Sequence, residues 1–139
     1  MSTEQNKMMI QRWVEAAWNN GNLAMADEIY SADYILHDPA RPIHGPEALK
    51  QFVATFRSGY PDLHATIEDM IAEGNKVVWR STVRGTHKGE FMGIAPTGKS
   101  ITLTGILISR FADDKVVEDW NNYDALGMLQ QLGVIPSMG

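Results

Sequence analysis

The 139-residue sequence contains no cysteine. This absence excludes disulfides, thiolate nucleophiles and zinc sites built on thiolates, and it is compatible with a reducing compartment. Histidine is scarce as well. The four histidines, at positions 37, 44, 64 and 87, show neither the HxH nor the HExxH spacing of metal sites. We therefore expect no bound metal.

Long apolar runs and clusters of basic residues are also missing. No stretch approaches the roughly 20 consecutive apolar residues of a membrane span. The first residues, MSTEQNKMMIQRW, are too polar for the apolar part of a signal peptide, so we expect a cytoplasmic protein. The net charge is −5 and the lysines and arginines are scattered singly. This pattern argues against nucleic acid as a partner and favours small molecules or further copies of the chain.

The length and the hydrophobic content are those of one compact unit. A chain of this length usually forms one domain, and 44% hydrophobic residues can fill one core. The sequence shows no internal repeat, low-complexity tract or linker. We therefore predict a single domain over residues 1–139.

Apolar residues at helical spacing mark the N-terminal part as an amphipathic helix. They are Ile10, Trp13, Val14, Ala17 and Trp18. Ser2 and Gln5 fit a capping box at the start of this helix, and Gly21 supplies a left-handed end. A second, short helix capped by Asn22 is predicted over residues 23–30, and a third over residues 45–61.

The second half of the chain changes to strand-like patterns. Segments 63–72 and 76–84 flank a Glu-Gly-Asn turn and predict a hairpin, and segments 100–111 and 115–122 predict a second strand pair. A last helix is predicted from Asp124 to a stop at Gly133.

Helices followed by antiparallel strands predict the α+β class. We expect N-terminal helices packed on a curved, mainly antiparallel four-stranded sheet, with a short C-terminal helix. Gly105 interrupts a β-branched strand and is predicted to be a bend or bulge that helps the sheet to curl. A curled sheet would leave a concave space under the helices.

Several segments together resemble the SnoaL-like polyketide/ester cyclase family of the NTF2-like superfamily. They are EAAWNNGNLAMADEIYSADYILHDP, GPEALKQFVATF, YPDLHATIEDMIAEGNKVVWRSTVRGTHKGEFMGIAPTGK and RFADDKVVEDWNNYDALGMLQQLG. The resemblance implies a cone-shaped homodimer with a mostly apolar pocket. The characterised cyclases of the family catalyse an intramolecular aldol condensation of a polyketide ester without cofactor or metal, and the resemblance implies this type of reaction. An aspartate serves there as base and acid, assisted by a histidine.

The catalytic pattern of that family is changed in this chain. Aligned on the family pattern, the aspartate falls at Asn121, the histidine at Leu107 and a pocket glutamine at Gly105. An amide has no basic site that could take a proton from carbon near neutral pH, and leucine can neither donate nor accept one. A shift of the alignment by one residue would bring Asp119 or Asp124 nearer the site.

Asp119 is one candidate for the missing base. If the strand over 100–111 presents its odd-numbered residues to the pocket, Asp119 and Asn121 share one face of the neighbouring strand. A carboxylate in an apolar cone would have a raised pKa, as a base acting on a carbon acid requires. The alternative is that Asp119 ends the strand at solvent, since aspartate is rarely buried.

His37 is the other candidate base, in the sequence His37-Asp38-Pro39. An imidazole oriented by a carboxylate can accept a proton, but an Asp-Pro pair is also a common turn.

Two acids nearer the C-terminus have structural interpretations. Asp124 is expected to cap the last helix, and Glu118 is expected to point outward or into an interface.

The aromatic residues predict a cavity, because one short sheet cannot pack so many rings without leaving space or meeting a partner. The predicted ligand contacts are Trp18, Tyr34, Phe52, Phe56, Trp79, His87, Gly105 and Leu107. Of these, Trp18 and Phe52 match pocket-wall positions in the family. For any single aromatic residue, packing in the core is the favoured alternative. His87 is expected at the pocket rim or in a structural hydrogen bond.

The other face of the sheet predicts the partner. Ile106 and Ile108, with Val78 and Trp120 in adjacent strands, would otherwise face water. We therefore expect homodimerisation through the sheet.

The sequence leaves the activity open between two main functions. The first is cofactor-free proton-transfer chemistry, such as aldol-type cyclisation or isomerisation, on a small apolar carbonyl or polyketide-like compound. Asp119 or His37 would be the base, and Asn121 would donate a hydrogen bond to an oxygen. The alternative is a non-catalytic module that binds a small hydrophobic ligand, which the changes at 105, 107 and 121 favour. A cofactor-free oxygenase of the same fold is a third alternative.

Overall fold

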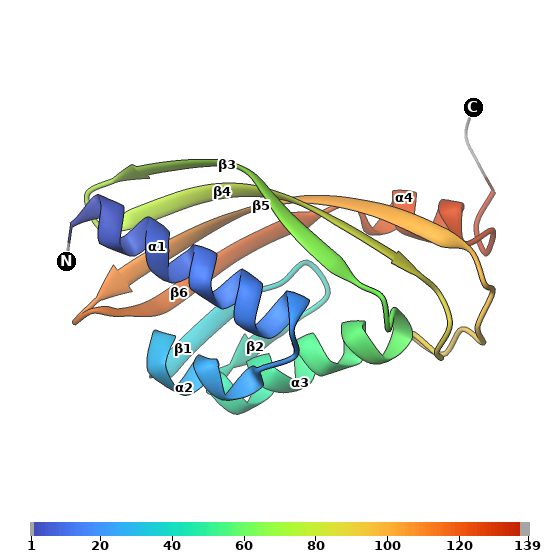
Figure 1. The fold of residues 1–139 in the computed structure, drawn as a ribbon, viewed down its shortest axis with the longest axis horizontal. Helices are drawn as coiled ribbons and strands as arrows, with labels where there is room; N and C mark the ends of the chain where they lie inside the picture. The colour runs from blue at the N-terminus through green and yellow to red at the C-terminus, as the bar shows by residue number, and fades with distance from the viewer. Residues whose placement is uncertain (1, 137–139) are drawn as a thin grey trace.

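The structure is a computed structural model that describes residues 2–136. Its elements depart from the predicted order of helices and then strands, because two strands precede the third predicted helix. In chain order they are α1 (Thr3–Trp13), the π-helix η1 (Val14–Asn19), the 3₁₀ helix η2 (Leu23–Met25), α2 (Ala26–Ile29), β1 (Tyr30–His37), β2 (Pro42–His44), α3 (Gly45–Gly59), β3 (His64–Glu73), β4 (Lys76–Thr86), β5 (Ser100–Ala112), β6 (Lys115–Tyr123) and α4 (Ala125–Gln131). Figure 1 shows their arrangement.

Over residues 2–136 the sheet has six strands in the order β2-β1-β6-β5-β4-β3, so the prediction of four strands was wrong. The α+β class and the curved sheet under helices are confirmed. The two additional strands lie in the segment before α3. There, Tyr30 begins β1 where the sequence predicted the end of a helix. β1 pairs in parallel with β6, about 80 residues later in the chain, and such a pairing has no local turn signal.

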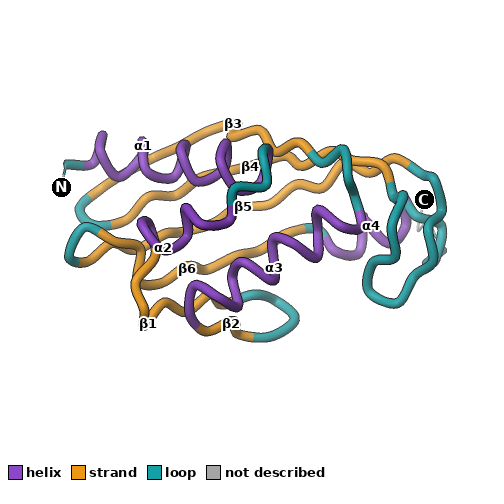
Figure 2. The backbone as a smooth tube through the Cα atoms, turned by 60° about the horizontal axis from the view of Figure 1, so that its bottom comes forward, coloured by secondary structure: helices purple, strands orange, loops and turns teal. Residues whose placement is uncertain are grey.

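The helices cover one face of this sheet (Figures 1 and 2). α1 packs on β3 and β4, whereas α3 packs on β1 and β2. The opposite face carries partly exposed apolar side chains, of which Ile106 is 50% exposed. Homodimerisation through this face stays a prediction. Among residues 2–136, no helix has both the length and the apolar character that crossing a membrane requires.

Local signals placed the helix ends well. Ser2 and Gln5 form the predicted capping box, with reciprocal hydrogen bonds of 2.9 and 3.1 Å. Gly21 adopts a left-handed φ of 73°. The helix differs from the prediction in its last turns, which widen into η1. There Arg57 Nη1 donates to the Trp18 carbonyl at 2.5 Å, so a group on another helix satisfies a backbone acceptor.

Both predicted hairpins form, but Gly105 is not at a bulge. The register of the β5–β6 pair shifts between Arg110 and Phe111 instead. Gly105 lies in regular register opposite Ser81 and Tyr123. A Cβ at Gly105 would be 3.1 Å from the Cβ of Tyr123, so this glycine makes room for the tyrosine.

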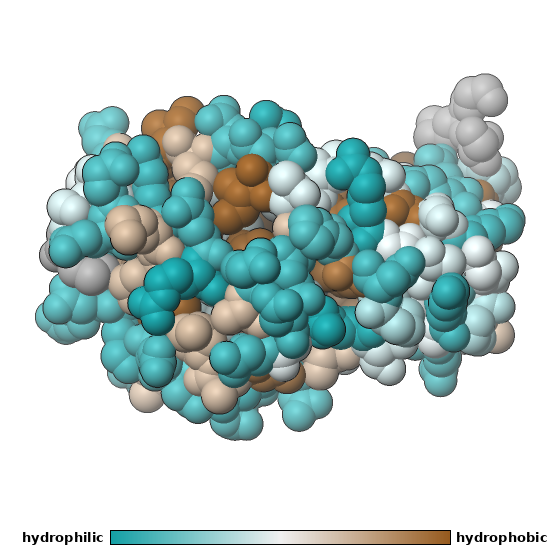
Figure 3. Space-filling view, viewed as in Figure 1, coloured by the Kyte–Doolittle hydropathy of each residue, from teal (hydrophilic) through white to brown (hydrophobic). Residues whose placement is uncertain are grey.

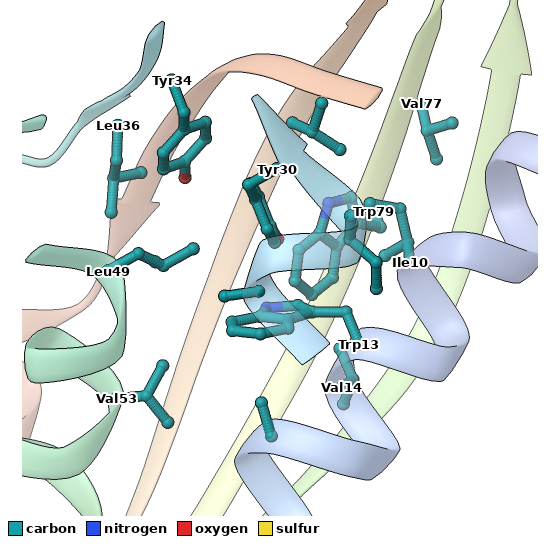
Figure 4. Close-up of a cluster of buried hydrophobic side chains, with 14 of the residues drawn as sticks. Ile10, Trp13, Val14, Tyr30, Tyr34, Leu36, Leu49, Val53, Val77 and Trp79 are labelled. Atoms are coloured by element: carbon teal, nitrogen blue, oxygen red, sulfur yellow. The ribbon is translucent and has the colours of Figure 1, made fainter. Parts of the chain in front are cut away.

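The interior consists of two hydrophobic clusters. The larger one, drawn in Figure 4, packs α1 and α3 against the sheet and includes side chains of β1. The smaller one lies toward α4 and the segment between β4 and β5. Trp18, Phe52 and Val83 contact both clusters. The space at this junction is where the candidate site lies.

Candidate active site

A cavity of about 740 Å³, counting the open space at its mouth, lies between the helices and the concave face of the sheet. Its aromatic wall residues are Trp13, Trp18, Tyr30, Tyr34, Phe52, Phe56, Trp79 and Tyr123. Gly105 and Leu107 also line it, so the cavity brings together all the predicted ligand contacts except His87. The face of the molecule in Figure 3 is mostly hydrophilic, with hydrophobic atoms visible in a hollow near its middle.

Asp119 is the one acidic side chain on the cavity wall within residues 2–136. It is only 2% exposed, so the alternative that Asp119 ends the strand at solvent was wrong. Its neighbours across β6 are Leu36 of β1 and Ser109 of β5. The carboxyl group accepts hydrogen bonds from the Tyr34 hydroxyl, at 2.6 Å, and from the Ser109 hydroxyl.

Trp79 determines which group is the donor in the hydrogen bond between Ser109 and Asp119. Its indole Nε1 lies 3.0 Å from Ser109 Oγ, and an indole N–H can only donate. Ser109 therefore accepts from Trp79 and gives its own proton to Asp119. The other carboxyl oxygen of Asp119 receives the Tyr34 proton. Each oxygen has two acceptor positions, so two positions stay free for another donor.

Burial raises the pKa of Asp119 to about 6, although the hydrogen bonds from Ser109 and Tyr34 counteract part of the rise. A carboxyl group with this pKa is mostly ionised at neutral pH and is a stronger base than an ordinary aspartate. Burial, together with the negative charge of Asp119, also raises the pKa of Tyr34. Tyr34 therefore stays a hydrogen-bond donor at neutral pH.

Asn121 follows two residues later on the same face of β6 and also lines the cavity. Its Nδ2 donates a long hydrogen bond of 3.4 Å to Asp38 Oδ1. The other oxygen of Asp38 accepts from the backbone N–H of Ala40 at 3.1 Å, which holds the turn after β1. Burial raises the pKa of Asp38. A second N–H of Asn121 remains for an oxygen in the cavity.

His37 lies outside the cavity, with its side chain 42% exposed. Its Nε2 is 2.7 Å from Glu118 Oε2, and its ring stacks on Trp120 at 5.5 Å between ring centres. Glu118 also accepts from Arg110, at 3.0 Å. Because neighbouring strand residues face opposite sides of a sheet, Leu36 points into the cavity and His37 points away from it. The structure therefore separates the two candidate bases.

His87 is fully buried but is not part of the cavity wall. Its Nδ1 accepts from the backbone N–H of Thr97 at 3.2 Å, across the segment that joins β4 and β5. This bond gives His87 a structural role, one of the two roles predicted for it. Across residues 2–136, no three His, Asp or Glu side chains are grouped as a metal site would need.

The sequence interpretation missed Tyr30 and Ser109. Tyr30 lines the cavity, but the sequence placed it in a helix. Ser109 contacts Asp119 and is fully buried. It continues the series 103, 105, 107 that the period-two pattern had already assigned to the pocket side, so extending that pattern by one step would have found it.

The family is decided by comparison with known proteins. The family model for SnoaL-like polyketide cyclases matches residues 8–132. The chain belongs to this family. Among similar proteins, the aklanonic acid methyl ester cyclase of Streptomyces galilaeus is 31% identical over 136 residues, covering 89% of this chain and 88% of the relative. The nogalonic acid methyl ester cyclase of Streptomyces nogalater is 29% identical over 126 residues, covering 85% and 90%.

Solved structures agree with the SnoaL-like assignment. AclR, a candidate hydroxylase from Streptomyces galilaeus, superposes with a TM-score of 0.88 at 30% identity, covering 99% of this chain and 87% of the other. IdmH, a candidate polyketide cyclase from Streptomyces antibioticus, superposes with a TM-score of 0.80 at 32% identity, covering 93% and 99%. The SnoaL-like fold therefore extends over nearly the whole chain.

Proposed function

We propose that this SnoaL-like protein catalyses cofactor-free proton transfer on a small apolar carbonyl compound held in the cavity. Asp119 is the base, and Asn121 donates a hydrogen bond to a carbonyl oxygen of the substrate. The observation that carries this proposal is the carboxyl group of Asp119, buried in the cavity wall with a pKa of about 6.

The reaction begins at a carbon next to the carbonyl group. Asp119 takes a proton from that carbon, and the electron pair of the C–H bond forms a C=C bond while the carbonyl electrons move to oxygen. The resulting enolate oxygen accepts a hydrogen bond from Asn121. A buried carboxylate suits this step, because its basicity is raised and water is kept away from the anion.

The fate of the enolate distinguishes cyclisation from isomerisation. In an aldol cyclisation its carbon attacks a second carbonyl group of the same molecule, and the new alkoxide takes the proton held by Asp119. In an isomerisation Asp119 returns the proton to a different carbon. The ester cyclases among the relatives favour cyclisation of a polyketide ester.

Deuterium exchange tests the base without knowledge of the natural substrate. We expect the protein to exchange the α-protons of 2-tetralone, a flat apolar ketone, in deuterated buffer, followed by proton NMR. Asp119→Asn should slow exchange by about 100-fold or more, the usual effect of losing a general base. His37→Gln serves as the matched control and should leave exchange unchanged, since His37 faces away from the cavity.

The binding module is the second candidate, because both oxygens of Asp119 already hold hydrogen bonds within the protein. In that case Asp119 would only be a buried structural acid. If exchange stays at the buffer rate while 2-tetralone raises the melting temperature, binding without catalysis is the better description. Exchange that Asp119→Asn does not reduce would exclude this residue as the base.

A further inference from the structure

Tyr30 is a wall residue of the cavity that the reaction above does not use. It is the first residue of β1 and lies in register with Val116 of β6. Its ring makes edge contacts with Trp13 and Tyr34, at 4.9 and 4.6 Å between ring centres. Figure 4 shows it among these buried side chains. The rings of Trp13 and Tyr34 therefore hold the ring of Tyr30 in place.

The hydroxyl of Tyr30 has no hydrogen-bond partner within residues 2–136, unlike that of Tyr34, which donates to Asp119. It is also not sealed off. The buried polar side-chain atoms that lack both a partner and exposed surface belong to Asn6, Tyr60 and His87. Because Tyr30 is 2% exposed and lines the cavity, the remaining surface of its hydroxyl opens into the cavity. A buried tyrosine hydroxyl usually has a partner, so a ligand oxygen is the natural one here.

The pairing of Tyr30 in β1 with β6 determines which substrate oxygen its hydroxyl can reach. Val116, its neighbour, precedes Asp119 on β6, and Asn121 follows Asp119. The two donors therefore lie on opposite sides of the base along the strand. A substrate that contacts both donors would therefore carry one oxygen toward Asn121 and a second toward Tyr30, on either side of the carbon that loses its proton.

We infer that Tyr30 is a second catalytic residue, whose hydroxyl donates to a second carbonyl oxygen of a 1,3-dicarbonyl substrate. This inference rests on the proposed function. When Asp119 removes the proton from the carbon between the two carbonyl groups, the electron pair spreads over both oxygens. Tyr30 then stabilises one oxygen and Asn121 the other, while the negative charge leaves Asp119 for the substrate.

The protonation state of Tyr30 is suitable for this role. Burial and the charge of Asp119 both raise its pKa well above the usual value, so the phenol keeps its proton at neutral pH. Hydrogen bonds to charged groups are roughly twice as strong as those between neutral groups. The hydrogen bond from Tyr30 is therefore stronger to the enolate than to the neutral carbonyl group, which is the requirement for catalysis.

The test measures binding of the anion of 1,3-indanedione, a flat apolar compound with two oxygens beside one acidic carbon. Asp119→Asn provides the background, because a neutral amide replaces the carboxyl group as it stands after it has taken the proton. In this background we compare Tyr30→Phe with the control Tyr60→Phe by absorbance titration at pH 8.5. The control also removes a buried hydroxyl without a partner, but one outside the cavity wall.

We expect Tyr30→Phe to weaken binding of the anion by about tenfold or more, the usual effect of losing a charge-assisted hydrogen bond. Tyr60→Phe should stay within twofold of the background. Equal affinities of the two double variants would overturn the role of Tyr30, and so would a failure of the Asp119→Asn background to bind the anion. Neither result affects the exchange of 2-tetralone by the unsubstituted protein, which tests the proposed base separately.

Discussion

Replacement of Asp119 by asparagine should change the pH dependence of stability in a defined direction. The pKa of Asp119 is about 6 in the folded protein, against an ordinary value of 3.8. The folded state therefore binds this proton more tightly than the unfolded chain does. The stabilising contribution is complete below pH 4, and it is lost as the pH rises through about 6.

The size of the effect follows from the two pKa values. Each pKa unit corresponds to about 1.4 kcal/mol, so the rise from 3.8 to about 6 amounts to about 3 kcal/mol. The asparagine variant lacks this titration. Its free energy of unfolding, relative to that of the unsubstituted protein, should therefore increase by about 3 kcal/mol in all, most of it between pH 4 and pH 7.

Urea denaturation at several pH values, followed by tryptophan fluorescence, measures this difference. Asp62→Asn is an informative control. Asp62 accepts two 2.7 Å hydrogen bonds from Thr86, from its backbone N–H and its hydroxyl, and these lower its pKa. Its contribution has the opposite sign, because the stabilisation is present at neutral pH and lost on acidification. The free energy of unfolding of the Asp62→Asn variant should therefore decrease relative to that of the unsubstituted protein as the pH rises.

A stability difference between the Asp119→Asn variant and the unsubstituted protein that stays constant from pH 4 to pH 7.5 would contradict a raised pKa of Asp119 in the folded protein. It would mean that the carboxyl group titrates alike in the folded and unfolded states. The raised basicity on which the proposed proton transfer depends would then be absent.

Two further predictions concern the cap of α4 and the changed family positions. Asp124→Ala removes the 2.9 Å hydrogen bond from the backbone N–H of Gly127, and we expect it to lower the free energy of unfolding in urea by about 1 kcal/mol. Asp124→Asn keeps an acceptor and should therefore lower the free energy of unfolding by less. An equal decrease in the two variants would contradict the capping role. The double variant Asn121→Asp with Leu107→His places an aspartate and a histidine where the resemblance predicts the family's acid and histidine. It should therefore introduce or raise cyclisation of aklanonic acid methyl ester, detected by chromatography. A well-folded double variant without product would count against an inherited pocket shape.

Short-range patterns predicted the elements whose partners are close in sequence. The capping box was predicted from Ser2 and Gln5, three positions apart, and the last helix cap from Asp124 at the start of that helix. The β3–β4 and β5–β6 hairpins follow from strand patterns on either side of a short turn. The parallel pairing of β1 with β6 has no such local signal, which is why two strands were missed.

The candidate site was only partly predictable for the same reason. Period-two alternation put Asp119 and Asn121 on one face of their strand. The aromatic wall residues predicted as ligand contacts were Trp18, Tyr34, Phe52, Phe56 and Trp79, whereas Tyr30 and Tyr123 were not predicted. Alternation does not say which face is covered or how deeply. The burial of Asp119 and its bond with Tyr34, 85 positions away, depend on the packing of β1 and the helices against the sheet.

Residue types and short spacings were sufficient to predict the family, the two hairpins and the polar side chains available for chemistry. Only the packing of distant segments placed Asp119 in the cavity wall with a raised pKa, His37 outside the cavity and Tyr30 among its wall residues. Burial and the proximity of distant residues arise only when the strands and helices pack together, and those two quantities set the strength of a base and of its hydrogen bonds.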